Sequence, residues 1–432
     1  MPVTNGAAAA KKIAIIGAGI SGMGAAHMLA ADHRVVLFES ESRLGGHART
    51  RMAGRLGDQA VDTGFIVFNY ANYPHLARLF AELDVPVVKS SMSFGASIRG
   101  GALEYGLASL SALFAQPANL LNPGFLRMCR DVARFNRHAA AAAAEPGLTV
   151  GGLCAKLGLG RYFRDYYIAP LSGAIWSTPT EKIMDFPAQA MITFFQNHAL
   201  MSVTGQHQWY TVEGGSVQYV SRLGTAMLAA GVDIRLGAHV AGVRRTPRGV
   251  EVRTHGAEWE RFDEVVFATH SDDTLALLSD ATPQEARVLG AIRYQPNDVV
   301  LHSDTSVMPK RRKVWSSWNY TEAADKGTER IDLTYWMNSL QPWLTADPLF
   351  VTLNATRPIR EDLIWDSTVL RHPVYDLAAL AAQEEARVMN GDNRTWFCGA
   401  WMKNGFHEDG LGSAVDVVTA LNAATELRVA AE

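Results

Sequence analysis

The stretch KKIAIIGAGISGMGAAHMLAADHRVVLFES, from Lys11 to Ser40, decides the fold. It begins with the apolar run Ile13–Ile16, which is typical of a buried parallel strand. Glycines at the spacing G-x-G-x-x-G follow, then a segment of helical composition, then a second apolar run, Val35–Phe38, which an acid closes. This order predicts a strand, turn, helix and strand that together bind a dinucleotide.

Each position of this unit has a chemical reason. The first glycine allows a tight turn, the second lets the backbone approach a pyrophosphate, and the third lets the helix pack on the strand. The helix N-terminus presents free N–H groups to the anion, and the closing acid can bind ribose hydroxyls. The alternative is a glycine-rich turn in an ordinary α/β unit. The expected contacts are Gly17, Gly19, Ile20, Ser21, Gly22, Glu39 and Ser40.

The next residues, ESESRLGGHART, distinguish between dinucleotides. They place Arg43 four residues after the acid, followed by the pair Gly45 and Gly46. This pattern resembles the E-x-x-x-R-x-G-G-R signature of the flavin amine oxidase and phytoene desaturase superfamily. The resemblance implies FAD, with the arginine and the glycines around the pyrophosphate. His47 stands where the family has arginine, and it is still expected to lie at the cofactor.

Three further segments resemble the same superfamily. VDTGFIVFN is similar to its D-x-G segment beneath the flavin ring, and GVDIRLGAHVAGVRRT and EVVFATHSD are similar to its segments at the adenine and beside the dinucleotide. WFCGAWMKNGFHEDGLGSAV is similar to its closing motif, in which a helix N-terminus points at the flavin pyrimidine, although alanine replaces the family's acid after the glycine. The implied contacts are Asp62, Thr63, Gly64, Phe65, Val240, Ala268, Thr269, Gly399, Ala400, Gly410, Leu411, Gly412 and Ala414.

The fold class that follows is α/β. We expect a Rossmann-like FAD-binding domain with a parallel sheet, made from residues 1–88, 206–288 and 386–432. The inserts 89–205 and 289–385 are expected to form an amine oxidase-like α+β substrate domain. The first insert has helical spacing, and the second has alternating apolar runs that predict an antiparallel sheet.

Within the superfamily, FIVFN, PLSGAIWSTP, HQWYTVEGGS and HEDGLGSAV resemble a bacterial branch of methyl-branched phospholipid fatty-acyl desaturases in furan fatty acid synthesis. This resemblance implies dehydrogenation of an acyl chain, with hydride transfer to flavin N5 and reoxidation by O₂ or another acceptor. His407 is the candidate base; its alternative is a loop histidine that caps a helix or binds the cofactor. The candidate substrate wall, for which core packing is the alternative, is Tyr166, Trp176, Met191, Phe194, Trp401 and Phe406.

Three other functions remain open. A flavin amine oxidase of this superfamily usually carries a lysine near flavin N5, but the expected strand YQPNDVVLH has Asn297 and Asp298 and no lysine. An FAD-dependent isomerase would act without net oxidation. A non-catalytic dinucleotide-binding partner of a lipid methyltransferase is the third alternative.

Composition limits the partners. The 432 residues include 40 Lys and Arg against 43 Asp and Glu, so a net charge of −3 gives no reason to expect nucleic acid binding. Cys129, Cys154 and Cys398 form no metal spacing, which predicts no metal site and a reducing cytoplasm, and Cys398 does not suggest covalent flavin. No apolar run is long enough to span a bilayer. The basic cluster Lys310–Lys313 and the amphipathic segment 126–137 leave open a peripheral contact with the inner face of the membrane.

Overall fold

The computed structural model describes residues 10–176, 180, 182–197, 200–201, 207–324 and 332–431. Both apolar runs of the opening stretch form strands of one parallel sheet, as predicted, with β1 at its centre. The sheet contains, in spatial order, β10 (Asp233–Arg235), β2 (Arg34–Phe38), β1 (Lys12–Ile16), β14 (Glu264–Phe267) and β20 (Thr395–Phe397).

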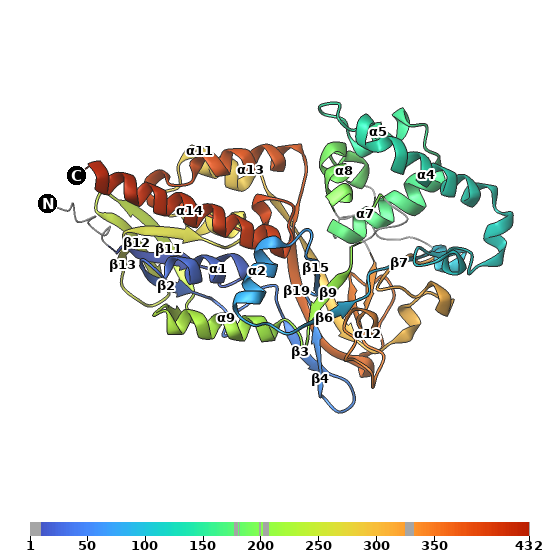
Figure 1. Ribbon diagram of the computed structural model, residues 1–432, viewed down its shortest axis with the longest axis horizontal. Coiled ribbons are helices and arrows are strands. Elements are labelled where there is room, and N and C mark those ends of the chain that lie inside the picture. The colour runs from blue at the N-terminus through green and yellow to red at the C-terminus, as the bar shows by residue number, and fades with distance from the viewer. Residues whose placement is uncertain are drawn as a thin grey trace.

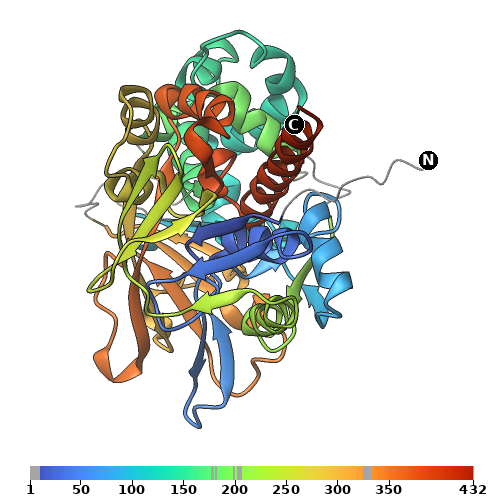
Figure 2. The same cartoon turned by 90° about the vertical axis from the view of Figure 1, so that its left-hand side faces the viewer.

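Both faces of the parallel sheet are covered, which explains why its strands are apolar on both sides. One face packs against α1 (Ile20–Leu29), α9 (Val217–Ala229) and α14 (His407–Ala431). The other face packs against α11, α13 and a small antiparallel sheet, an arrangement that is visible in Figures 1 and 2. These elements are α11 (Pro283–Gly290), α13 (Leu377–Met389), β11 (Val240–Thr246), β12 (Gly249–Thr254) and β13 (Glu260–Phe262).

A seven-stranded sheet forms the second half of the molecule. Its strand pairs are antiparallel, as predicted, except that β16 runs parallel to β7. That exception arises because the sheet combines strands from both inserts. In spatial order it contains β19 (Ile364–Val374), β15 (Arg293–His302), β18 (Phe350–Leu353), β17 (Leu333–Trp336), β16 (Trp318–Thr321), β7 (Phe94–Ile98) and β8 (Leu103–Gly106).

Helices of the first insert pack over this sheet in one apolar cluster. The longest of them, α4, buries Phe125, Met128, Phe135 and Ala139 in the cluster, so its apolar face packs on the core. These helices are α3 (Leu110–Leu113), α4 (Pro123–Ala142), α5 (Val150–Lys156), α6 (Arg161–Phe163), a π-helical turn (Arg164–Ile168), α7 (Ala169–Trp176) and α8 (Ala188–Asn197).

Smaller elements connect the two halves. A hairpin, a three-stranded sheet and one helix lie along the seam in Figure 1. They are β3 (Thr50–Ala53), β4 (Gln59–Asp62), β5 (Val67–Phe68), β6 (Val87–Ser90), β9 (Trp209–Val212) and α2 (Pro74–Glu82). Two further short helices are α10 (Ser271–Leu277), which contacts α11 and β11, and α12 (Met337–Leu340), which contacts β17 and β18.

The domain boundaries remain predictions. The boundary at 88/89 falls inside β6, that at 288/289 inside α11, and that at 385/386 inside α13, while 205/206 touches residues outside the described part. Over the described residues, none of the helices combines the length and the hydropathy that crossing a bilayer requires.

Candidate functional site

The backbone of the loop after β1 leaves room for an anion to bind at the N-terminus of α1. Gly17 has a φ of +99°, and a Cβ atom built on Gly22 would lie 1.8 Å from the Gly17 carbonyl oxygen, so neither position accepts a side chain. By contrast, a Cβ on Gly19 would meet no protein atom within 4 Å. Gly19 is the N-cap of α1 and makes no side-chain cap, so the N–H groups of the first turn lie beside open space. Ile20 and Ser21 form that turn, as predicted from the motif.

Glu39 closes β2 directly beside this loop. Its buried carboxylate accepts hydrogen bonds from the Ala18 N–H (2.7 Å), the Glu41 N–H (2.8 Å) and the Ser40 hydroxyl (3.2 Å). Two carboxylate oxygens offer about four acceptor sites, so room remains for ribose hydroxyls. The Glu39 carbonyl also accepts the Ala238 N–H, which brings Val240, at the start of β11, close to the same edge.

Arg43 braces the paired-glycine loop. Its guanidinium donates to the carbonyl oxygens of Leu44, Gly46 and Ala48 and pairs with Glu41, so most of its donors serve the protein. Gly46 has a φ of +54° and lies close to Gly19: a Cβ atom built on Gly46 would be 3.0 Å from the Cα of Gly19. The predicted phosphate role of Arg43 is therefore better described as positioning of this loop.

His47 lies at the centre of a group of partly buried imidazoles. Its ring is 5.7 Å from that of His270 and 5.8 Å from that of His372, and it hydrogen bonds the Arg371 carbonyl oxygen. Burial lowers the pKa of His47 and lowers those of His270 and His372 to about 3, so all three rings are neutral. Nε2 of His47 is buried and has no partner among the described residues. An unpaired buried acceptor at this place fits a bound group that brings a donor.

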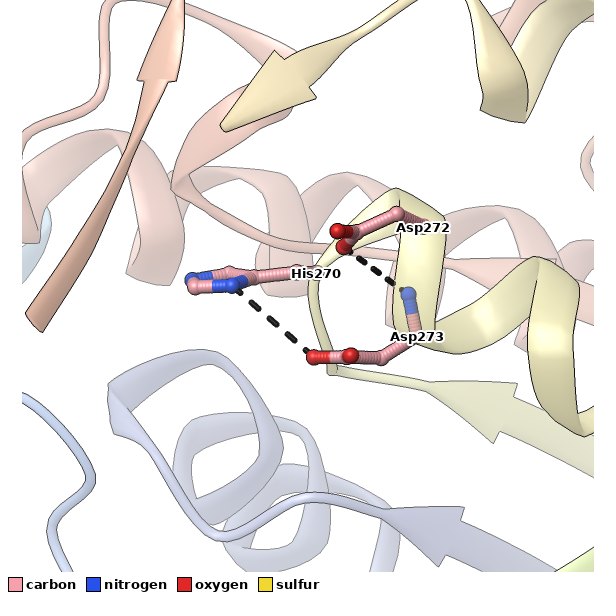
Figure 3. Close-up of side chains that lie close together, drawn as sticks. All are labelled: His270, Asp272 and Asp273. Carbon is pink, nitrogen blue, oxygen red and sulfur yellow. Dashed lines mark hydrogen bonds and ion pairs between the residues drawn. The ribbon is translucent and has the colours of Figure 1, made fainter. Parts of the chain in front are cut away.

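His270 also belongs to a group that could be mistaken for a metal site (Figure 3). Its Nδ1 is 3.9 Å from Asp273, and Asp272 lies beside them on the first turn of α10. Arg371 donates to Asp272 at 2.7 Å and also pairs with Asp273, so a guanidinium already contacts both carboxylates. A divalent cation would have to displace this guanidinium.

The D-x-G segment carries a structural role in addition to its predicted place beneath the flavin, which remains a prediction. The Asp62 carboxylate accepts hydrogen bonds from the Thr50 hydroxyl, the Ser216 N–H and hydroxyl, and the Gln341 side-chain amide, at 2.6 to 3.0 Å. Burial nevertheless raises its pKa to about 6. Protein donors satisfy this carboxylate, so the geometry favours a structural junction over the predicted cofactor contact.

The residues that follow Asp62 hold the cofactor loop in place. A Cβ on Gly64 would lie 1.9 Å from the His47 carbonyl oxygen, so this contact requires glycine. The Thr63 hydroxyl donates to the Arg49 carbonyl oxygen, and the Arg49 guanidinium makes two bonds, of 2.5 and 3.2 Å, to Asp366 on β19. Sequence reasoning missed this ion pair, because 317 residues separate its members.

The predicted base, His407, begins α14. Its ring stacks on Phe65 with centroids 4.0 Å apart, and its Nε2 lies 2.5 Å from the Tyr219 hydroxyl. Burial lowers the pKa of His407 to about 3 and raises that of Tyr219 well above its usual value, so the neutral tyrosine donates and the imidazole accepts. With its acceptor nitrogen engaged, His407 is better placed to position Phe65 than to take a proton, and its catalytic role remains a prediction.

Two acids in the first turn of α14 are also engaged. Glu408 accepts the N–H groups of His75 and Leu76 at the start of α2, and Asp409 accepts that of Phe406. Burial raises the pKa of Asp409 to about 6. These carboxylates satisfy backbone donors, so they do not offer an amine-binding site.

The closing motif meets the opening loop. The Gly399 N–H donates to the Ser413 hydroxyl, and a Cβ on Gly410 would lie 2.9 Å from the Ser21 hydroxyl, so α14 packs closely on α1. The Ala268 N–H donates to the Ile16 carbonyl at the end of β1, which places Ala268 and Thr269 beside the same loop. The remaining predicted residues on this helix and the turn before it are Ala400, Leu411, Gly412 and Ala414.

The match to a family of known proteins agrees with this geometry. The family model for flavin-containing amine oxidoreductases matches residues 20–336. The chain belongs to this family. It is an FAD-dependent oxidoreductase, and the open loop at Gly19, the Glu39 carboxylate and the unpaired Nε2 of His47 fit its cofactor, FAD.

Solved structures of this fold include enzymes with different chemistry. A fatty acid isomerase of P. acnes that produces CLA has a TM-score of 0.65 at 14% identity, covering 95% of this chain and 98% of its own. A cyclohexylamine oxidase of Brevibacterium oxydans scores 0.63 at 16% identity (96% and 100% covered), and a reduced UDP-galactopyranose mutase scores 0.68 at 13% (96% of each). At such identities the likeness shows the fold alone. No curated protein matches the sequence significantly.

The predicted substrate wall of this flavin oxidoreductase is brought together only in part. Phe194 of α8 stacks on Phe406 with centroids 4.8 Å apart, and Trp176 of α7 lies 5.0 Å from Phe194. Met191 is buried in the same cluster, and Tyr166 is partly buried against it. Trp401 is different: it donates to the Thr269 carbonyl and packs in the cluster on the other side of the parallel sheet. These contacts do not support its place in the wall, which remains a prediction.

Proposed function

We propose that this FAD-dependent oxidoreductase dehydrogenates a fatty acyl chain, with a methyl-branched phospholipid as the substrate and O₂ as the electron acceptor. The observation that carries the proposal is the contact between Phe194 and Phe406. It joins the apolar helical insert to the residue just before α14, the helix expected at the flavin. An apolar wall at this position suits a hydrocarbon chain and excludes water.

Bound FAD would supply the hydride acceptor for this reaction, and the proton lost from the neighbouring carbon would pass to a base, for which His407 is the predicted candidate. The chain's own residues bind and orient the reactants. The first turn of α1 would hold an anion, Glu39 would hold a hydroxyl group, and the partly exposed Phe406, packed on the buried Phe194, would present apolar surface. None of these proposed roles requires a metal ion. Under the proposal the enzyme works in the cytoplasm, against the inner face of the membrane.

Amine oxidation is less well supported. The start of β15 has no lysine, and the Asn297 side chain is engaged with His372 and Asn354. Phe194 and Phe406 stack on each other and leave no gap between them for an amine. Isomerisation without net oxidation is the second candidate, because a protein of similar fold is a fatty acid isomerase and would share the substrate class.

An anaerobic reduction experiment tests the proposal. The FAD-loaded protein is mixed with phospholipids bearing methyl-branched or unbranched acyl chains, and separately with amines, while the visible flavin absorbance is followed. Bleaching by the branched lipid, with loss of two hydrogens by mass spectrometry, is expected. Bleaching by amines alone would overturn the proposal, and lipid altered at constant mass would show isomerisation.

A further inference from the structure

An uncharged segment of the first insert reaches the surface next to the seven-stranded sheet. Residues 105–126 contain no Asp, Glu, Lys or Arg. The segment nevertheless exposes large apolar side chains, with Leu110 exposed by 77% and Leu121 by 88%. We define the leucine face as Leu107, Leu110, Leu120, Leu121 and Leu126, all of which are exposed. Scattered apolar residues are ordinary on a protein surface, but five within 20 residues of chain are not.

Hydrogen bonds and core packing hold the leucine face in a defined conformation. The Ser109 hydroxyl caps α3, and the Asn122 side chain caps α4. Between these caps, the Asn119 amide donates to the Glu104 carbonyl, and Phe114 and Phe125 pack in the core below. The aromatic side chains of the segment thus point inward while the leucines stay outside. The segment runs from β8 into the first turn of α4, away from the two chain ends in Figure 1.

Basic residues lie beside two parts of this face, α3 and the start of α4. Residues 312–314, part of the basic cluster 310–313, contact α3 directly. Glu104 balances Arg311, but Glu104 is fully buried, so it presents no negative charge to a partner. Lys313, together with Arg130 on α4, is exposed, and no described residue pairs with either.

Other charges near the face are already paired or are positive. Lys310 donates to the Gly100 carbonyl oxygen, and Arg312 lies over the rings of Trp315 and Trp336 and keeps its charge there. The exposed Arg127 lies 3.6 Å from the buried carboxylate of Asp131. The surroundings of the leucine face are therefore positive.

We propose that the leucine face docks on an anionic phospholipid bilayer. Apolar side chains with cations beside them match the two layers of such a surface, its acyl boundary and its phosphates. A second copy of this chain fits less well, because pairing two such faces would bring their basic surroundings together. The choice of a bilayer rests on the proposed function, since a lipid substrate has to be reached at the membrane, but the test below measures no turnover.

Vesicle flotation of the FAD-loaded full chain tests this surface. Vesicles of phosphatidylcholine alone are compared with vesicles of phosphatidylcholine and phosphatidylglycerol, at low and high salt. We expect flotation with the anionic vesicles that weakens as salt rises. Leu120→Ser combined with Leu121→Ser should lower the partition coefficient by at least about tenfold.

Two variants control for general effects. Leu56→Ser with Leu228→Ser removes two equally exposed leucines that lie on the β3–β4 hairpin and on α9, and it should float like the natural protein. Lys313→Glu with Arg130→Glu should lose most of its preference for anionic vesicles. Flavin absorbance and the melting temperature report whether each variant is folded.

Three outcomes would overturn the inference. The natural protein could fail to float with anionic vesicles, or the Leu120/Leu121 variant could float as well as the natural protein. Light scattering could instead show a dimer that the same variant dissociates, in which case a second copy covers the face. Loss of flotation with unchanged reduction by detergent-dispersed lipid would separate docking from the proposed chemistry.

Discussion

Gly19→Val is expected to weaken FAD binding strongly without unfolding the protein. A side chain at this position would meet no protein atom within 4 Å, and its φ of −73° with ψ of −177° suits any residue. The free energy of unfolding of the apoprotein should therefore fall by no more than about 1 kcal/mol, the usual cost of a poor N-cap residue. The side chain would instead fill the space through which an anion reaches the first turn of α1.

The expected loss of affinity follows from the hydrogen bonds that would be blocked. Two charge-assisted bonds to backbone N–H groups, at about 1.5 kcal/mol each, amount to about 3 kcal/mol, or roughly a hundredfold rise in the dissociation constant. Quenching of flavin fluorescence on titration of the apoprotein with FAD measures this constant. Thermal unfolding of the apoprotein measures the stability in parallel.

A matched control is available in Gly290→Val. Gly290 is exposed at the end of α11, and a Cβ there has its nearest neighbour at 3.7 Å. This variant should bind FAD as the natural protein does. If Gly19→Val also retained FAD with natural affinity, the assignment of this loop to the pyrophosphate would be refuted. If the apoprotein of Gly19→Val were unfolded, the conclusion that a side chain fits at position 19 would be wrong.

Three further outcomes test the neighbouring interactions. Burial lowers the pKa of His407 to about 3, so between pH 6.5 and 3 the unfolded chain binds a proton that the folded state does not, and stability falls on acidification. In urea titrations, His407→Gln should reduce the loss of unfolding free energy between about pH 7 and 5 by about 1 kcal/mol. This is less than the full pKa shift implies, because the ring is partly exposed. Arg49→Ala removes the buried partner of the Asp366 carboxylate and leaves it only the more exposed Arg51, at 3.4 Å, so it should cost about 2 kcal/mol of unfolding free energy. Arg51→Ala should cost under about 0.5 kcal/mol, and equal losses would contradict the role given to the Arg49 pair. Phe406→Ala should raise the KM for the acyl lipid about tenfold and leave flavin reduction by dithionite unchanged, and an unaltered KM would remove this ring from the substrate wall.

The sequence by itself determined the parts whose chemistry is local. The strand, glycines, helix and acid from Lys12 to Glu39 are contiguous, so the spacing alone predicts the turn, the open helix end and the carboxylate beside it. The strands of the second insert were predictable for a similar reason. Alternation of apolar residues reports on one strand at a time, and it needs no knowledge of the partner strand.

Tertiary structure decided the contacts between residues that are far apart in the chain. Tyr219 holds His407 across 188 residues, and Gln341 holds Asp62 across 279 residues. No local pattern marks such pairs, so a histidine predicted as a base and an aspartate predicted as a cofactor contact turned out to have protein partners. The parallel pairing of β7 with β16 escaped prediction in the same way, because strand order depends on how the two inserts fold together.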